Sequence, residues 1–328
     1  MFVLGIQGSP RKNGNCEYLL SAFLKECETL GARTETIRPH TLDIGPCKEL
    51  IVCEKKGFCP IRDEMEDLGY RKVKQADAVI LATPVFFYGV SAQAKVFIDR
   101  CQMFWGRKYK LRLKDPDRHQ RRGFLLSVAA SAGKRLFEGV DLTTRYFYDA
   151  ISTDYSGSLT YNKVEGAGDI KDQPNLDADI RSSATDLLAP LQNRRKLIFA
   201  SPGNGARALQ ASAFAKEAAK GRIEVIAFGG APPQVPDTKT IEAMAKTGLD
   251  VKYLQVSHLE NITELAADLQ KNDDVILIKS PGESFSTDFL NEQPDVWDIA
   301  PADGKRSADT VKDEIDAHVR KLALTASP

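Results

Sequence analysis

Two α/β domains, each built on a doubly wound parallel sheet, are the architecture that this 328-residue sequence predicts. Short apolar runs alternate with segments of helical periodicity, which is typical of parallel sheets covered by helices on both faces. The alternation begins at residue 2, is interrupted by a polar stretch over residues 169–186, and starts again at residue 196. The length also favours two domains over one. We therefore expect a first domain over residues 1–188, a linker over 189–195 and a second domain over 196–328.

Composition and charge exclude several classes of protein. Apolar residues make up 42% of the chain, which allows ordinary cores, and 45 basic side chains balance 45 acidic ones. A formal net charge near zero argues against a nucleic-acid partner. No apolar run approaches the ~18–20 residues that cross a bilayer, and no secretory leader precedes the first strand. We expect a cytoplasmic protein that binds neither nucleic acid nor a membrane.

The first expected strand, an apolar run over residues 2–6, leads into a polar loop and then into a helix. A loop of this kind directs backbone N–H groups and the positive end of a helix at one spot, which suits a phosphate. The side chains that it offers are those of Ser9, Arg11, Lys12, Asn13 and Asn15. An ordinary strand-to-helix turn is the alternative. The loop matches neither the signature for nucleoside triphosphates nor that for Rossmann dinucleotides.

The other elements of the first domain follow the same alternation. Strands are expected at 34–38, 78–82 and 123–129, and helices from residue 63 and over 92–101, the latter capped by Ser91. Ligands of such sheets bind where the strands end at their carboxyl side. The loop after residue 82 carries Phe86, Phe87 and Tyr88, which favours a flat aromatic cofactor beside the phosphate. The alternative is that these aromatic rings fill the core.

Three separated motifs, at residues 8–15, 83–92 and 95–100, resemble those of the flavodoxin-like NADPH-dependent FMN reductases and the related iron–sulfur flavoproteins. The resemblance covers about residues 1–188. It implies FMN, an electron donor that is NAD(P)H or a small redox protein, and a homodimer or homotetramer. It also implies a set of contacts: the phosphate on Ser9, Arg11, Asn13, Asn15 and Cys16, and the ring on Pro84, Val85, Phe86, Phe87, Tyr88 and Gly89 and near Ala130 and Ser131.

The six cysteines all lie in the first domain, and three of them share one loop. Clustered thiols in a reducing compartment suggest metal or redox chemistry. Iron–sulfur flavoproteins carry a compact run of four cysteines for a [4Fe–4S] cluster. Cys47, Cys53 and Cys59 match the first, third and fourth of these, whereas Leu50 stands at the second. Three thiolates hold a cluster only with an outside ligand or an open iron. The alternative is a loop that has lost its cluster, and we expect little or no iron.

The second domain repeats the alternation of strands and helices. Strands are expected at 196–200, 223–228 and 275–278, and helices up to residue 220 and near 238–246, 262–270 and 308–322. The loop over 201–207 has the C-x5-R spacing of a phosphatase loop, with Ser201 in place of the cysteine. Together with segments 224–232 and 295–299, it resembles the low-molecular-weight tyrosine phosphatases and related arsenate reductases over about residues 195–325.

Several catalytic parts of that family are absent from the second domain. Ser201 cannot ionise at neutral pH as a thiol beside a helix N-terminus does. Ala208 replaces the hydroxyl expected after the arginine, and the segment 300–302 lacks the expected general acid. We therefore expect a silent domain that binds a small oxyanion through Ser201, Gly203, Asn204 and Arg207. The alternatives are a phosphatase or arsenate reductase with a flavodoxin-like accessory domain, and a sensor in which the anion acts on the flavin domain.

Overall fold

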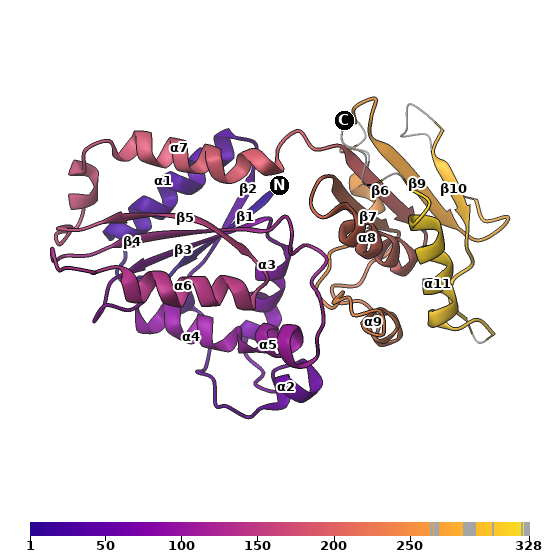
Figure 1. Cartoon of the computed structure of the whole chain (residues 1–328), viewed down its shortest axis with the longest axis horizontal. Helices are drawn as coiled ribbons and strands as arrows, with labels where there is room; N and C mark the ends of the chain where they lie inside the picture. Colours follow the sequence, from indigo (N-terminus) through magenta and orange to yellow (C-terminus); the bar gives the residue numbers. More distant parts are fainter. Residues whose placement is uncertain (263–264, 266–268, 285–292, 304, 323, 325–328) are drawn as a thin grey trace. The chain divides into compact units, whose positions relative to one another are not determined.

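The computed structural model describes the chain except residues 263–264, 266–268, 285–292, 304, 323 and 325–328, and it divides into two compact units (Figure 1). The first unit comprises Met1–Arg112 and Gln120–Gln192, and the second comprises Leu113–His119 and Asn193–Pro328. Both units are α/β folds built on a parallel sheet. The chain passes between the two units three times, after Arg112, after His119 and after Gln192.

The first unit contains a five-stranded parallel sheet in the order β2-β1-β3-β4-β5. The strands are β1 (Phe2–Gln7), β2 (Arg33–Ile37), β3 (Ala78–Pro84), β4 (Arg122–Val128) and β5 (Asp154–Tyr161). In β1, Val3 lies opposite Thr34 of β2 and Ala78 of β3. This is the strand order of flavodoxin-like sheets, in which the order reverses between β1 and β3 and a ligand crevice opens at that point.

Helices cover both faces of this sheet. Figure 1 shows α1 and α7 on one side and α4, α5 and α6 on the other. The helices are α1 (Asn15–Thr29), α2 (Val52–Lys56), α3 (Tyr70–Gln75), α4 (Ala92–Arg100), α5 (Gln102–Trp105), α6 (Glu138–Ala150) and α7 (Leu176–Leu188). Short turns are η1 (Pro39–Thr41), η2 (Met65–Gly69), η3 (Gly106–Lys110), η4 (Asp169–Asp172) and η5 (Ala189–Leu191). One face of α1 is buried, and its Phe23 stacks on Phe124 with ring centroids 5.1 Å apart.

The second unit contains another five-stranded parallel sheet, in the order β10-β9-β6-β7-β8. Its strands are β6 (Lys196–Ser201), β7 (Glu224–Gly229), β8 (Ser257–His258), β9 (Asp274–Lys279) and β10 (Asp295–Asp298). Its described helices are α8 (Ala206–Ala219), α9 (Thr238–Ala245), η6 (Leu259–Asn261) and α11 (Ala308–Val319). The helix expected over 262–270 lies largely outside the described residues. The strand order reverses between β6 and β9, which places the loop after β6 at the switch point.

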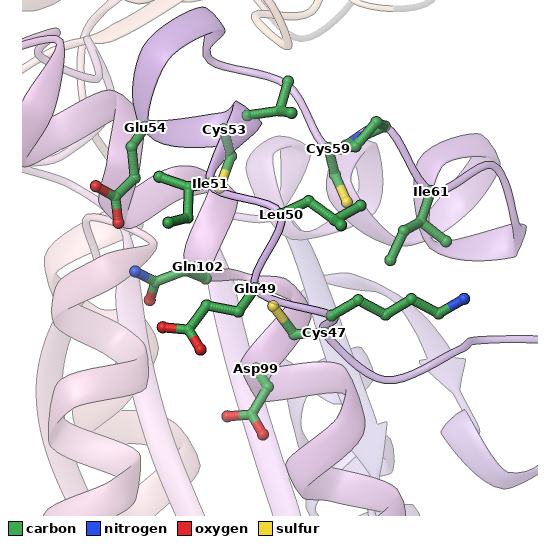
Figure 2. Close-up of a pocket in the computed structure, with 13 residues that line it drawn as sticks. Cys47, Glu49, Leu50, Ile51, Cys53, Glu54, Cys59, Ile61, Asp99 and Gln102 are labelled. Atoms are coloured by element: carbon green, nitrogen blue, oxygen red, sulfur yellow. The ribbon is translucent and has the colours of Figure 1, made fainter.

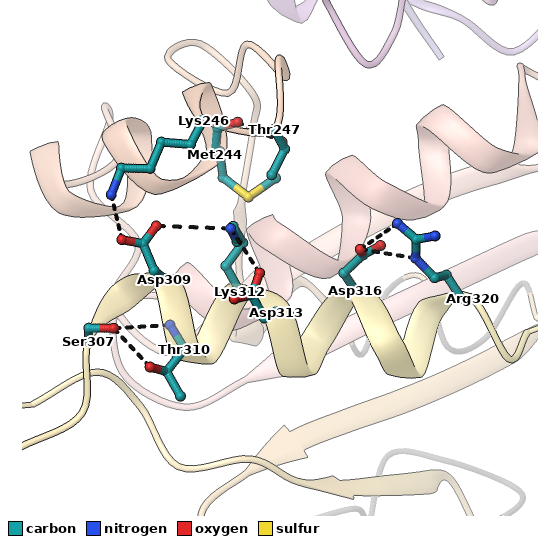
Figure 3. Close-up of polar contacts among 10 residues, drawn as sticks. All are labelled: Met244, Lys246, Thr247, Ser307, Asp309, Thr310, Lys312, Asp313, Asp316 and Arg320. Carbon is teal, nitrogen blue, oxygen red and sulfur yellow. Dashed lines mark hydrogen bonds and ion pairs between the residues drawn. The ribbon is translucent and has the colours of Figure 1, made fainter.

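Polar contacts hold α9 and α11 of the second unit together (Figure 3). Lys246, which follows α9, pairs with Asp309 in the first turn of α11. Ser307 caps α11 by accepting a hydrogen bond from the Thr310 N–H at 3.1 Å. These contacts fix the position at which α11 begins.

A short segment that precedes β4 in sequence, Leu113–His119, groups with the second unit. Lys114 donates its N–H to the Gly248 carbonyl at 2.7 Å and accepts from the Asp250 N–H at 2.8 Å. Asp117 pairs with Lys216 of α8 at 2.6 Å. These contacts explain the grouping, and no sequence pattern had indicated it.

Candidate functional site

The loop after β1 starts at Gly8, where the backbone packs too closely for any other residue. The Gly8 N–H donates to the Ala82 carbonyl at 2.7 Å. A Cβ atom on Gly8 would lie 2.8 Å from the Ala94 Cβ, a separation that real Cβ atoms essentially never show. Ser91, the N-cap of α4, donates its hydroxyl to the Gly8 carbonyl. The loop therefore begins in a fixed position against β3 and α4.

Residues 9–14 then lead to the uncapped start of α1. The hydroxyl of Ser9 accepts from the Arg11 N–H at 3.3 Å, and the Asn13 N–H donates to Glu17 at 2.8 Å. The N-cap residue is Gly14, which has no side chain to accept hydrogen bonds from the first turn of α1. A helix N-terminus in this state offers its N–H groups and the positive end of its dipole to an anion.

The expected phosphate contacts divide into two groups in the structure. Arg11, Lys12 and Asn13 are exposed on the loop, and Arg11 Nη1 donates to the Glu165 carbonyl at 3.3 Å. Asn15 instead uses its side chain to bind the loop after β5, with 2.8 Å from Nδ2 to the Gly166 carbonyl and 2.9 Å from the Gly168 N–H to Oδ1. Cys16 is buried in the core, and burial raises the pKa of its thiol to about 12. The cations and Asn13 are thus the side chains presented by this loop.

The aromatic residues after β3 form a tight, exposed turn. Phe86 and Gly89 exchange two backbone hydrogen bonds of 2.9 Å. Phe87 and Tyr88 between them adopt positive φ angles of 49° and 64°. All three aromatic side chains are exposed, and Phe87 is 105% exposed. This excludes the alternative that the rings fill the core of the unit.

The base of the aromatic turn is held by hydrogen bonds to neighbouring strands. The Val85 N–H donates to the Val128 carbonyl at 2.9 Å, and Ser127 donates its hydroxyl to the Thr83 carbonyl at 2.9 Å. The turn also rests against the start of α6, because a Cβ on Gly139 would lie 2.3 Å from the Tyr88 carbonyl oxygen. Ala130 and Ser131, at the end of β4, are exposed beside Gly133, which faces the Tyr88 hydroxyl.

The loops after β1, β3 and β4 thus lie at one edge of the sheet, and together they combine two chemical features. One is an uncapped helix N-terminus with Arg11 and Lys12, and the other is a rigid turn of exposed aromatic side chains. These residues fit a ligand with a phosphate and a flat ring, such as FMN. Sequence reasoning missed the loop over 165–170, because its contacts with Arg11 and Asn15 are made by backbone atoms.

The cysteine loop, residues 46–62, lines an open pocket of about 400 Å³ together with Asp99 and Gln102 (Figure 2). Cys47, Cys53 and Cys59 all line it. Leu50, at the position where a fourth cysteine would stand, also lines it and is 53% exposed. Burial raises the pKa of Cys53, and the neighbouring thiols of Cys59 and Cys47 raise it further. Besides the three thiols and the apolar residues Leu50, Ile51 and Val52, charged and polar residues line the pocket: Lys48, Glu49, Glu54, Asp99 and Gln102.

The donor set of the cysteine loop does not match a four-thiolate cluster. Leu50 offers no ligand atom. In the described part of the chain, no three histidine, cysteine, aspartate or glutamate side chains are arranged to hold a metal ion. The loop is nevertheless well supported, since Arg107 Nη1 donates to the Gly57 carbonyl at 2.7 Å. A Cβ on Gly106 would lie 2.9 Å from the Cys53 carbonyl oxygen. The start of η3 is therefore in close contact with α2 of the cysteine loop.

In the second unit, Arg207 in the first turn of α8 is buried. Arg207 Nη1 donates to the Ile299 carbonyl at 2.6 Å, and Nη2 lies 3.7 Å from a carboxylate oxygen of Glu283. Burial lowers the pKa of Arg207, and Glu283 offsets this only in part. Ser201 is fully buried, and its hydroxyl accepts from the Ala208 N–H at 3.4 Å. Gly203, Asn204 and Arg207 line a pocket of about 350 Å³, whose lining does not include Ser201.

Among the helices that the structure describes, none is long and apolar enough to cross a membrane.

Comparison with known proteins points to the first unit. Residues 1–148 match the family model of NADPH-dependent FMN reductases. The chain is 35% identical over 174 residues to an iron–sulfur flavoprotein of Methanosarcina thermophila, a match that covers 50% of this chain and 85% of that protein. Over 100 residues it is 46% identical to an iron–sulfur flavoprotein of Archaeoglobus fulgidus and 41% identical to one of Methanocaldococcus jannaschii. The matches cover 30% of this chain in both cases, and 45% and 51% of those two proteins.

Proposed function

Because the chain belongs to the iron–sulfur flavoprotein family, we propose that its first unit is an FMN-dependent oxidoreductase. The observation that carries this proposal is the pairing of an uncapped helix N-terminus with a rigid, exposed aromatic turn at one sheet edge. FMN, when bound, accepts a hydride or electrons and passes them on. The proposed donor is NAD(P)H or a small redox protein.

Each part of the site has a distinct role in this proposal. The N–H groups at the start of α1 and the side chains of Arg11, Lys12 and Asn13 hold the phosphate. The turn Phe86–Gly89 supplies aromatic surface and backbone groups for the ring, and its hydrogen bonds keep it in place before the ligand arrives. The exposed face of Phe87 also favours self-association, so the proposal includes a homodimer or homotetramer that covers this turn.

An anaerobic absorption spectrum before and after NADPH tests the proposal. We expect a yellow protein whose released flavin is FMN and whose flavin absorbance bleaches with NADPH. If dithionite bleaches the flavin absorbance but NADPH and NADH do not, the electron donor is a small redox protein and not a nicotinamide. A protein that binds no FMN on reconstitution would overturn it. Light scattering on the same sample measures the mass, and a monomer would contradict the proposed assembly.

For the second unit, we propose oxyanion binding without turnover. Arg207 is a buried cation whose paired carboxylate is beyond hydrogen-bonding distance, and such a group favours a bound anion. Arg207 can make two parallel bonds to a tetrahedral anion, whereas Ser201 is a neutral, buried hydroxyl. The alternative, a phosphatase or arsenate reductase, lacks its nucleophilic thiol.

Melting temperatures measured against phosphate, sulfate or arsenate test the proposed oxyanion site, since a ligand held only by the native state raises stability. We expect a rise in the wild type and none in Arg207→Ala. Arg222→Ala, at the opposite end of α8, is the matched control and should behave as the wild type. Hydrolysis of an aryl phosphate that disappears in Ser201→Ala would contradict the absence of turnover.

A further inference from the structure

The pocket beside Arg207 has room and chemistry for more than an inorganic anion. We propose that it binds a phosphomonoester whose organic group carries an N–H or O–H donor, and that Gln210 recognises this donor. The inference rests on the proposed oxyanion site and adds the class of ligand. Arg207 and Gln210 both line the pocket, and their i,i+3 spacing places them on the same face of α8.

The electrostatics of one side of the pocket favour the phosphate. Three helices begin at this pocket, because its lining includes Ala206 of α8, the α9 cap Asp237 and Ala308 of α11. Asp237 caps α9 and Ser307 caps α11, whereas α8 has no side-chain N-cap, so α8 is the helix that offers the positive end of its dipole to an anion. The exposed Lys239 also lines the pocket and adds a second cation to the buried Arg207.

The two acids in the lining are already engaged. Asp237 caps α9 by accepting from the Thr240 N–H at 2.9 Å, and Glu283 accepts from the Ser280 N–H at 2.8 Å. Their carboxylates are therefore held in place by backbone donors. An anion in the pocket meets two cations and the uncapped N-terminus of α8 in addition to these bound acids.

Gln210 is the observation that points to an organic group. Its side chain is 2% exposed, and in the described part of the chain its Oε1 has no hydrogen-bond partner. Buried amide oxygens are rarely left without a donor. A phosphate ester with a hydroxyl or amine on its organic group would supply that donor while its phosphate lies on Arg207, one helical turn away.

The size and the remaining walls of the pocket agree with an organic group. Its volume of about 350 Å³ lies within the range of roughly 300–1,000 Å³ that is usual for small-molecule sites. Apolar side chains complete the lining: Pro202, Pro301, Ala302 and Val311. An inorganic phosphate leaves both these walls and Gln210 without contacts.

Calorimetry with inorganic phosphate, methyl phosphate and phosphoethanolamine tests the inference on the full chain. One hydrogen bond is worth about 0.5–1.5 kcal/mol, so phosphoethanolamine should bind roughly 2- to 12-fold more tightly than methyl phosphate. Gln210→Leu should remove this difference and leave the affinity for phosphate unchanged. Gln210→Met is a second variant of similar shape, and Gln255→Leu, at an exposed position of the same unit, is the control.

The outcomes separate this inference from the oxyanion site on which it rests. If phosphate binds but the two esters bind equally, or if Gln210→Leu and Gln210→Met keep the difference, the role of Gln210 is wrong and the anion site stands. If none of the three anions binds, and Arg207→Ala behaves as the wild type, both proposals fail.

Discussion

Arg100 and Asp63 form a buried ion pair at the base of the cysteine loop, with Nη2 3.0 Å from Oδ1 and side chains that are 1% and 7% exposed. Arg100 also donates to the Gly45 carbonyl at 2.9 Å, and Asp63 accepts from the N–H groups of Gly45 and Met65, each at 3.1 Å. The pair therefore ties together the two ends of the loop, which are 18 residues apart. We therefore expect the shape of the pocket at the cysteine loop to depend on this pair.

Removing the guanidinium should loosen the cysteine loop. Breaking a buried pair leaves an uncompensated charge, so Arg100→Met should lower the free energy of unfolding by about 3–5 kcal/mol. The thiols of Cys53 and Cys59 should then react faster with a thiol reagent in the native state. Lys95→Met is the control on the same helix, because the exposed pair Lys95–Asp99 contributes roughly 0.3–0.5 kcal/mol. Equal labelling rates in all three proteins would show that the pair does not hold the loop.

The same pair predicts how stability depends on pH. Burial alone would raise the pKa of Asp63, but hydrogen bonds from Arg100 and the Gly45 N–H outweigh it and hold that pKa below its usual value. A carboxyl whose pKa is lower in the folded state stabilises the protein above its unfolded pKa of about 3.9, and the stabilisation is lost as pH falls through the folded value. Denaturant unfolding should show stability falling below about pH 4. Asp63→Asn should show a shallower fall, and an identical slope would contradict this assignment.

The parts of the fold that the sequence predicts are those with continuous apolar runs. β1, β3 and β4 are buried along nearly their whole length, so their composition identifies them. β5 was missed because it lies at the sheet edge, where alternate residues are exposed and its sequence is rich in polar side chains. β8 and β10 were missed because they are only two and four residues long. The helix α6, with polar residues on its exposed face, was also missed.

The candidate site was predictable as a set of loops but not as a set of contacts. Strand ends in a parallel sheet must share one edge, so the loops after β1 and β3 could be placed together. The binding of Asn15 to backbone atoms about 150 residues away could not be predicted, because backbone partners leave no signal in the sequence. The pairing of Arg100 with Asp63 joins residues 37 apart across an irregular loop. Hydrophobic periodicity does not predict contacts across such a loop.

Gly8 tests the packing at the start of the phosphate loop. Gly8→Ala should cost about 1–3 kcal/mol of unfolding free energy, because the new methyl group overlaps Ala94 and the Ala82 carbonyl. Gly45→Ala is the matched control, since its nearest atom would lie at 3.8 Å. Thermal or denaturant unfolding measures both. Wild-type stability in Gly8→Ala would mean that the loop does not approach β3 and α4 as closely as the structure has it.

Arg11 tests the phosphate contact itself. Arg11→Ala removes one charge-assisted hydrogen bond, so FMN binding should weaken by about 1.5–3 kcal/mol, or roughly ten- to a hundredfold. Flavin fluorescence during titration of apoprotein measures the affinity. Arg181→Ala removes an exposed arginine on α7 and should leave the affinity unchanged. Unchanged affinity in Arg11→Ala would place the phosphate elsewhere.

Leu50 tests whether the missing ligand decides the iron content. A [4Fe–4S] cluster takes four thiolates, and the loop supplies three. Anaerobic reconstitution of the wild type should therefore give little or no iron, whereas Leu50→Cys should bind close to four irons per chain. Iron analysis and the visible absorption spectrum measure this, with Leu50→Ser as the control for a small polar residue at the same position. If the wild type binds four irons that are lost in Cys53→Ser, an outside ligand completes the site. The chain would then hold its cluster with three of its own thiolates.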